Sequence, residues 1–142
     1  MVDSFPYEKR YKYPHFESSH AILWEKFIDQ NPKAYDTVQY DLHVGDPPPF
    51  DPTLADGTDI NQDALYRFKI DVVGHFNGGV DIIEIKPNAG ASAIGQVQGY
   101  KTLYIRDERP SGNVGMVIIT DKLNQNMEYL CKRENIALIV VK

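Results

Sequence analysis

Two acidic residues and a lysine near the middle of the chain have the types and spacing for metal chemistry on a phosphate. Asp71 lies in a run of β-branched residues, and Glu84 and Lys86 lie two apart in the next such run. Two neighbouring carboxylates repel each other unless a cation binds between them, and Mg²⁺ and Mn²⁺ prefer oxygen ligands. A lysine beside that cation can offset the charge that develops on a phosphate under attack. The pattern indicates a metal site with a cationic neighbour.

The dipeptide Asn77-Gly78 between the two runs predicts the turn of a β-hairpin. Both residue types tolerate the positive φ angles of a type I′ turn, which favours a two-residue loop. Pairing outward from this turn brings Asp71 opposite Glu84, and paired Cβ atoms lie about 4.5–5.5 Å apart. Lys86 shares their side of the sheet because side chains alternate along a strand. The alternative is an ordinary salt bridge between Asp71 and Lys86 on a solvated sheet face.

The segment after the hairpin carries a glutamine and a tyrosine four residues apart. Gln96 and Tyr100 lie in a helix that we predict over residues 92–105, so they stack on one of its faces. The alternative for this pair is a tyrosine at the edge of the core and a solvated glutamine.

Taken in order, Asp71, Glu84-x-Lys86 and Gln96-x-x-x-Tyr100 resemble the motif of the PD-(D/E)xK nuclease superfamily, and most closely that of its RecB-type exonuclease branch. The resemblance implies a restriction-endonuclease-like fold and metal-dependent hydrolysis of phosphodiester bonds in DNA. The implied ligands of Mg²⁺ or Mn²⁺ are Asp71, Glu84 and the backbone carbonyl of Ile85. In this family the lysine, here Lys86, assists the attacking water, and Gln96 and Tyr100 would help to place the nucleic-acid strand.

The chain departs from the family pattern at two positions. Ile70 stands where the superfamily has its proline, directly before Asp71. RecB-type nucleases often bring a histidine from the first helix to the metal, which makes His20 a candidate ligand, but Phe16 stands where a glycine usually precedes it. The alternative for His20 is a surface histidine near the start of a helix.

The remaining patterns predict an α/β fold with the element order α-β-β-β-α-β-α-β. We predict helices over 18–30, 92–105 and 121–134, and strands over 37–44, 65–76, 80–86, 114–120 and 136–141. The first helix has an apolar stripe of Leu23, Trp24, Phe27 and Ile28, and the last has one of Leu123, Met127 and Leu130. Continuous apolar runs in the last two strands suit a sheet covered on both faces. We expect a mixed β-sheet with flanking helices in one domain over 18–142.

Single residues predict further details of the helices. Ser18 or Ser19 is expected to cap the first helix, and Ser92 the second. Gly95 and Gly99 form a smooth strip along the second helix. Because glycine costs about 1 kcal/mol against alanine inside a helix, we expect this strip to pack closely against the hairpin.

Two segments have less regular patterns. Residues 1–17 form an N-terminal arm in which basic residues alternate with aromatic ones. Either its aromatic residues dock on its own domain or on a neighbouring subunit of a homo-oligomer, or the arm contacts a nucleic-acid backbone and stacks on bases. The proline-rich acidic segment 46–63 predicts a long loop, which either shapes the substrate entrance or is an exposed insertion.

The composition sets broad limits on function. The chain has 142 residues, a net charge of −5 and one cysteine, Cys131, which excludes an internal disulfide. The negative charge argues against tight non-specific binding of duplex DNA. There is no membrane-length apolar run and no hydrophobic N-terminal signal, so we expect a cytoplasmic protein. The sequence also has no P-loop, no zinc-ligand spacing and no G-x-S-x-G motif.

Two functions from different classes therefore compete. The first is a metal-dependent nuclease, a phosphodiester hydrolase that acts on DNA. The second is a non-catalytic structural or interaction component of a larger assembly that keeps the nuclease fold. The acidic composition, the aromatic arm and the proline-rich loop fit the second. The pair of opposed acids with a lysine favours the first, because an unused site has no reason to keep them.

Overall fold

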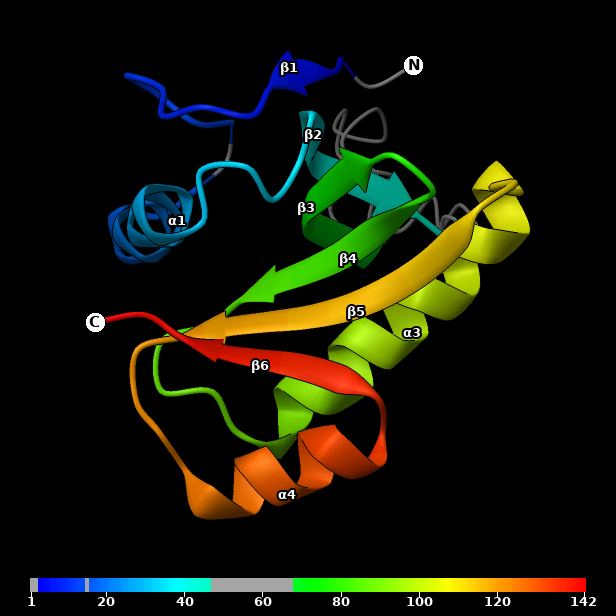
Figure 1. The fold of residues 1–142 in the computed structure, drawn as a ribbon. Coiled ribbons are helices and arrows are strands. Elements are labelled where there is room, and N and C mark those ends of the chain that lie inside the picture. Colours follow the sequence, from blue (N-terminus) through cyan, green and yellow to red (C-terminus); the bar gives the residue numbers. More distant parts are fainter. Residues whose placement is uncertain (1–2, 15, 47–67) are drawn as a thin grey trace, which may run out of the picture.

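The computed structural model describes residues 3–14, 16–46 and 68–142, which form one sheet with helices on both faces (Figure 1). The strands are β1 (Phe5–Pro6), β2 (Thr37–Val44), β3 (Phe68–Phe76), β4 (Gly79–Ile85), β5 (Asn113–Thr120) and β6 (Ile136–Val140). The helices are α1 (Ser18–Gln30), α3 (Ala91–Glu108) and α4 (Gln125–Arg133). The predicted α/β class is confirmed. β1 is a strand that the sequence analysis did not predict. Residues 65–67 of the predicted third element and all but Asp46 of the proline-rich segment lie outside the described ranges.

The six strands lie in the sheet in the order in which they occur in the chain. β1, β2, β3 and β4 pair antiparallel, whereas β4, β5 and β6 pair parallel. Parallel neighbours need a crossover connection, which α3 supplies between β4 and β5 and α4 between β5 and β6. The sheet is therefore mixed, as the sequence predicts.

Each face of the sheet has its own hydrophobic core. Helix α1 and the N-terminal arm cover one face, and α3 and α4 cover the other (Figure 1). The α1-side core contains the predicted stripe of α1, all of which is buried: Leu23, Trp24, Phe27 and Ile28. The α3-side core is formed from the helix face that carries Ala93, Val97, Tyr100 and Tyr104. Residues of β4 alternate between the two cores.

The N-terminal arm docks on its own chain, which confirms the first interpretation of its aromatic residues. Phe5 pairs with Val38 of β2, and Phe5, Tyr7 and Phe16 pack against the α1-side core. The ring of Phe16 lies 5.5 Å from that of Tyr40. The Tyr40 hydroxyl accepts a hydrogen bond from the Trp24 indole N–H at 3.0 Å. The arm therefore completes the cover of this face.

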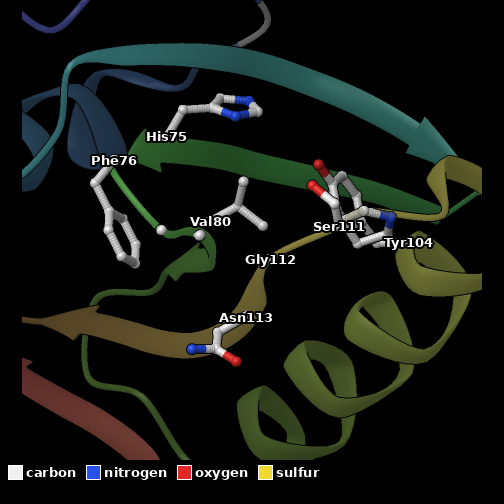
Figure 2. Close-up of a pocket in the computed structure, with 10 residues that line it drawn as sticks. His75, Phe76, Val80, Tyr104, Ser111, Gly112 and Asn113 are labelled. Carbon is white, nitrogen blue, oxygen red and sulfur yellow. The ribbon is translucent and has the colours of Figure 1, made fainter.

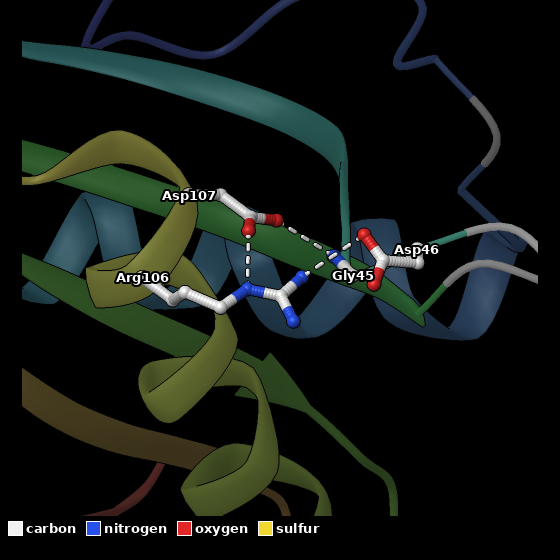
Figure 3. Close-up of polar contacts among 4 residues, drawn as sticks. All are labelled: Gly45, Asp46, Arg106 and Asp107. Atoms are coloured by element: carbon white, nitrogen blue, oxygen red, sulfur yellow. Dashed lines mark hydrogen bonds and ion pairs between the residues drawn. The ribbon is translucent and has the colours of Figure 1, made fainter.

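The C-terminal end of α3 is fixed to the end of β2 (Figure 3). The Asp107 carboxylate accepts a hydrogen bond from the backbone N–H of Gly45 at 2.8 Å, and the Arg106 guanidinium contacts both Asp107 and Asp46. The helix reaches Glu108, three residues beyond its predicted end at 105. These contacts between distant parts of the chain explain why the polar residues extend the helix instead of ending it.

The expected helix caps are wrong. The N-cap positions are Glu17 for α1 and Gly90 for α3, and neither has a side-chain capping bond. Ser18, Ser19 and Ser92 lie one or two residues later, inside the first helical turn. Both helices therefore begin without a side-chain cap.

The last helix is shorter than predicted and begins at residue 125 instead of 121. Asn124 caps it by accepting hydrogen bonds from two backbone N–H groups of the first turn. Only Met127 of the predicted stripe is buried; Leu123 and Leu130 are 65% and 40% exposed. The following strand, β6, lies at the edge of the sheet, and only Ile136 among its five residues is buried. The expectation of a fully covered final strand is therefore wrong.

The glycine strip of α3 does not pack against the hairpin. Gly95 and Gly99 are exposed, and a Cβ atom built on either would have no neighbour within 4 Å. The helix instead turns the face with Val97 and Tyr104 toward the sheet. The expectation of close backbone packing is wrong, because the larger apolar side chains determine which face is buried.

Replacing Gly95 with alanine should therefore stabilise the protein by about 0.5–1 kcal/mol, because it removes the cost of glycine in a helix and meets no neighbour. Urea denaturation of the purified variant would measure this change. Gly74→Ala is the matched control: its Cβ would lie 2.6 Å from the Tyr35 ring, so it should destabilise. A loss of stability in Gly95→Ala would show that this strip is a packing surface after all.

No helix within the described ranges is long and apolar enough to span a bilayer.

Candidate functional site

The β3–β4 hairpin has the register that the sequence predicts. Phe76 pairs with Gly79, and the pairing continues to Val72 opposite Ile83, which leaves Asp71 and Glu84 as the next opposed positions. Only Gly78 of the two turn residues has a positive φ, at 101°, so the turn is not of the predicted type I′. The loop still has two residues, and for this reason the register is unchanged.

The carboxylate of Asp71 lies between the two strands where their pairing ends. Its Oδ2 atom accepts a hydrogen bond from the backbone N–H of Ile85 at 2.9 Å. This contact crosses from β3 to β4 just beyond their last backbone pair, Val72 with Ile83. Asp71 is half-buried, and its carboxylate also interacts with the side chain of Glu84.

Glu84 is the most unusual side chain of the site, because its carboxyl group is buried and one of its two oxygens has no hydrogen-bond partner among the described residues. It is only 6% exposed, and its Oε2 atom has no hydrogen-bond partner in the described part of the chain. The neighbouring residues Ile83 and Ile85 belong to the α1-side core, so alternation directs Glu84 toward α3. An unpaired buried carboxylate is costly for a stable fold.

Charge and burial together change the acidity of this group. Burial raises the pKa of Glu84 far above its ordinary range. The hydrogen bond with Asp71 and the negative charge of Asp71 raise it further, and the positive charge of Lys86 opposes the rise. Burial is also the main cause of the raised pKa of the Tyr100 hydroxyl, with smaller contributions from Glu84 and Asp71. The structure thus brings together four of the predicted residues: Asp71, Glu84, Lys86 and Tyr100.

Gln96 and His20 are placed differently. Gln96 is exposed on α3, whereas Tyr100, one turn later, is buried and lies with its ring 6.2 Å from that of Phe68. His20 belongs to α1, which covers the sheet face opposite to Glu84. Within the described ranges no three His, Cys, Asp or Glu side chains form a group that could hold a metal ion, so His20 does not join the two acids.

Asp41 is a feature of this region that the sequence pattern did not indicate. Tyr40 contributes to the α1-side core and Leu42 to the α3-side core, although alternation should place both on one face. The reversal occurs at Asp41, which has a left-handed φ of 52° and would pair with Asp71 at the one interruption of the β2–β3 ladder. Such strained residues often cluster at functional sites. The regular alternation of Thr37–Val44 gave no signal of it.

The residues present fit a hard divalent cation. The described chain offers the carboxylates of Asp71 and Glu84 at adjacent positions, and the Oε2 atom of Glu84 lacks a partner. Mg²⁺ and Mn²⁺ accept carboxylate oxygens and keep several waters, so two protein carboxylates are sufficient. Asp71 and Glu84 would therefore hold the ion.

We expect Glu84→Gln to stabilise the metal-free protein at pH 8 by about 1–3 kcal/mol, because glutamine is neutral without the proton that Glu84 must take up on folding at this pH. The folded state holds the Glu84 proton at pH values where the unfolded state has lost it. The wild-type free energy of unfolding should therefore fall as pH rises above the ordinary carboxyl range. Urea denaturation in EDTA at pH 5 and pH 8 measures both effects. An equal effect of the substitution at the two pH values would contradict the assignment.

A separate pocket of about 410 Å³ lies at the opposite, turn end of the hairpin (Figure 2). His75, Phe76, Tyr104, Ser111 and Asn113 contribute to its lining, which contains no acidic residue. The imidazole of His75 lies 2.7 Å from the side-chain oxygen of Gln39, and burial lowers its pKa. This pocket is not part of the acidic site.

Comparison with known proteins gives no relative for this chain: no family model, no curated protein and no solved structure matches it.

Proposed function

We propose that this chain is a Mg²⁺- or Mn²⁺-dependent nuclease of restriction-endonuclease-like fold that hydrolyses phosphodiester bonds in DNA. The observation that carries the proposal is the buried Glu84 carboxylate, whose Oε2 atom lacks a partner and which lies at the position opposite Asp71. A fold selected only for stability would avoid two opposed acids with one of them buried. A bound cation would remove the repulsion and satisfy the oxygen.

Each residue has a definite task in this mechanism. A divalent cation held by Asp71 and Glu84 would lower the pKa of a coordinated water and offset charge on the phosphate. Lys86 directly follows β4, is exposed, and acts electrostatically on Glu84, so its ammonium group can orient a water and stabilise the phosphate oxygens. Tyr100 and, one turn earlier on α3, Gln96 would contact the nucleic-acid strand.

The order of the elements supports the proposed fold. An antiparallel meander of β2, β3 and β4 is followed by α3 and by a parallel strand, β5. The acids lie on the second and third strands of this meander, and Lys86 lies where the third strand ends. This is the arrangement that the resemblance to the PD-(D/E)xK superfamily implies for the three catalytic residues.

One observation favours the rival, non-catalytic role. The Asp71 carboxylate already accepts the Ile85 N–H, so it has a structural use even without an ion. In that case Asp71 would only close the end of the hairpin. The hydrogen bond to Ile85 does not account for the buried Oε2 atom of Glu84, which lacks a partner in the described part of the chain, and for this reason the nuclease is the better interpretation.

The direct test is cleavage of labelled single-stranded and double-stranded DNA, each with Mg²⁺, Mn²⁺ or EDTA. We expect cleavage with either cation and none with EDTA. Glu84→Gln, purified in the same way, is the control for a contaminating nuclease and should be inactive. Cleavage by the variant equal to that of wild type, or no cleavage of either DNA by wild type, would overturn the proposal.

A further inference from the structure

The N-terminal arm presents a fully exposed aromatic side chain between two cations. Tyr11 is as exposed as a residue in an extended chain, although the other aromatic residues of the described arm are at least partly buried. Arg10 precedes it and Lys12 follows it. Docking of the arm therefore explains why its other described rings are buried or partly buried. It does not explain Tyr11, whose ring packs against no other described residue.

Hydrogen bonds fix the shape of this segment, which we call the Arg10–Tyr13 loop. The Tyr13 hydroxyl accepts the backbone N–H of Arg10 at 3.0 Å and donates to the Glu25 carboxylate of α1 at 2.9 Å. The Arg10 Nε–H donates to the backbone carbonyl of Lys12 at 3.2 Å. The Arg10 guanidinium also lies 4.0 Å above the centre of the Phe5 ring. The loop is thus closed on itself and attached to the domain, with Tyr11 at its tip.

The charges around the loop leave two cations available for an anion. Lys9 is neutralised by Asp29 at 2.8 Å, and Glu25 is engaged by Tyr13. Within the described ranges no carboxylate forms an ion pair with Arg10 or Lys12. A shallow groove of about 450 Å³ runs beside them. Tyr11, Tyr13 and Phe16 contribute to its lining, and so does Glu25, whose carboxylate accepts the Tyr13 hydroxyl. Positive charge and an exposed ring therefore occur together on one groove.

We propose that the Arg10–Tyr13 loop binds single-stranded nucleic acid, with Tyr11 stacked on a base and Arg10 and Lys12 against the flanking phosphates. This combination of a stacking ring with a cationic groove is typical of single-strand binding, because only unpaired bases expose their faces. The net charge of −5 disfavours a duplex lying across the molecule. The inference rests on the proposed function for the choice of nucleic acid, and it names the single strand as the substrate form.

The loop is also attached close to the strands that carry the acids. The rings of Phe5, Tyr13 and Phe16 lie 5.5–5.9 Å from that of Tyr40. Tyr40 pairs with Val72, the residue after Asp71. The loop therefore lies against the strands that carry the two acids, but on the α1 side of the sheet, whereas Glu84 faces α3.

Fluorescence anisotropy of labelled oligo-dT and oligo-U in EDTA tests this inference without cleavage. Stacking on one base contributes about 1–3 kcal/mol, so Tyr11→Ala should raise Kd roughly 5- to 150-fold, whereas Tyr11→Phe should bind nearly as wild type. Lys12→Gln should lower the slope of log Kd against log salt by about 0.7. The comparison of the two oligonucleotides shows whether DNA or RNA is preferred.

Tyr129→Ala is the matched control. Tyr129 is 66% exposed beside Lys132 and Arg133 on α4, but lies outside the arm. An equal loss of binding in both alanine variants, an unchanged Kd in Tyr11→Ala, or duplex binding as tight as single-strand binding would each overturn the inference. A protein that binds through Tyr11 but never cleaves would support the loop and overturn the nuclease, so the two proposals fail separately.

Discussion

Lys86→Ala should lower the rate of DNA cleavage by about 10²–10³-fold, which is the usual cost of losing one preorganised electrostatic contact to the transition state. Folding should be almost unaffected, since Lys86 is exposed and an exposed charge pair contributes only about 0–1 kcal/mol. The measurement is single-turnover cleavage of a short single-stranded DNA at saturating Mn²⁺. Thermal unfolding of the same preparation shows whether the variant is folded.

Two further variants give this experiment its controls. Lys132→Ala removes an exposed lysine from α4 and should cleave as wild type does. Lys86→Arg keeps the positive charge but changes its geometry, so it should retain part of the rate. Equal rates for wild type and Lys86→Ala would mean that the lysine has no role in the chemistry, and the acid pair would then need a different explanation.

Local signals in the sequence were sufficient to predict the register of the hairpin and the buried face of α1. Asn77-Gly78 determines a two-residue loop, and the loop length alone fixes which residues of β3 and β4 are opposed. The predicted turn type was wrong, but the register does not depend on it. In α1, the spacing of Leu23, Trp24, Phe27 and Ile28 identified the buried face because these side chains have no polar atoms to direct them elsewhere, apart from one indole N–H.

Features that depend on distant contacts could not be predicted in this way. The last turn of α3 exists because Asp107 binds the backbone of Gly45, and no local pattern contains that information. The reversal at Asp41 interrupts a strand whose alternation is perfect in the sequence. The orientation of α3 followed its large apolar residues, and two glycines had no influence on it.

For the candidate site, the sequence identified residue types and register but not their environment. It predicted that Asp71 and Glu84 would be opposed, and they are the positions that follow the last backbone pair, Val72 with Ile83. It did not predict that Asp71 would bind the Ile85 N–H, or that one oxygen of Glu84 would be buried without a partner. The position of His20 depended on which sheet face α1 covers, a property of the tertiary fold alone.

Asp71→Asn should abolish both cleavage and the stabilisation of the protein by Mn²⁺. The amide can still accept the Ile85 N–H, so the hairpin end should stay closed, but the site loses one of its two charged ligands. At a Mn²⁺ concentration 100 times Kd, a folded-state site is stabilised by about 2.7 kcal/mol, which raises Tm by roughly 5–10 °C in a chain of this size. We expect this shift in wild type and almost none in Asp71→Asn.

Asp81→Asn is the control that separates the site from a general effect of losing a carboxylate. Asp81 is also half-buried in the hairpin, but it accepts a hydrogen bond from the Tyr35 hydroxyl at 2.7 Å on the α1 side of the sheet. The Mn²⁺-induced rise in Tm of Asp81→Asn should therefore match that of wild type, even if its metal-free Tm is lower. If Asp71→Asn kept the full rise, the ion would bind elsewhere. The unpartnered oxygen of Glu84 would then be a cost of the fold and not part of a metal site.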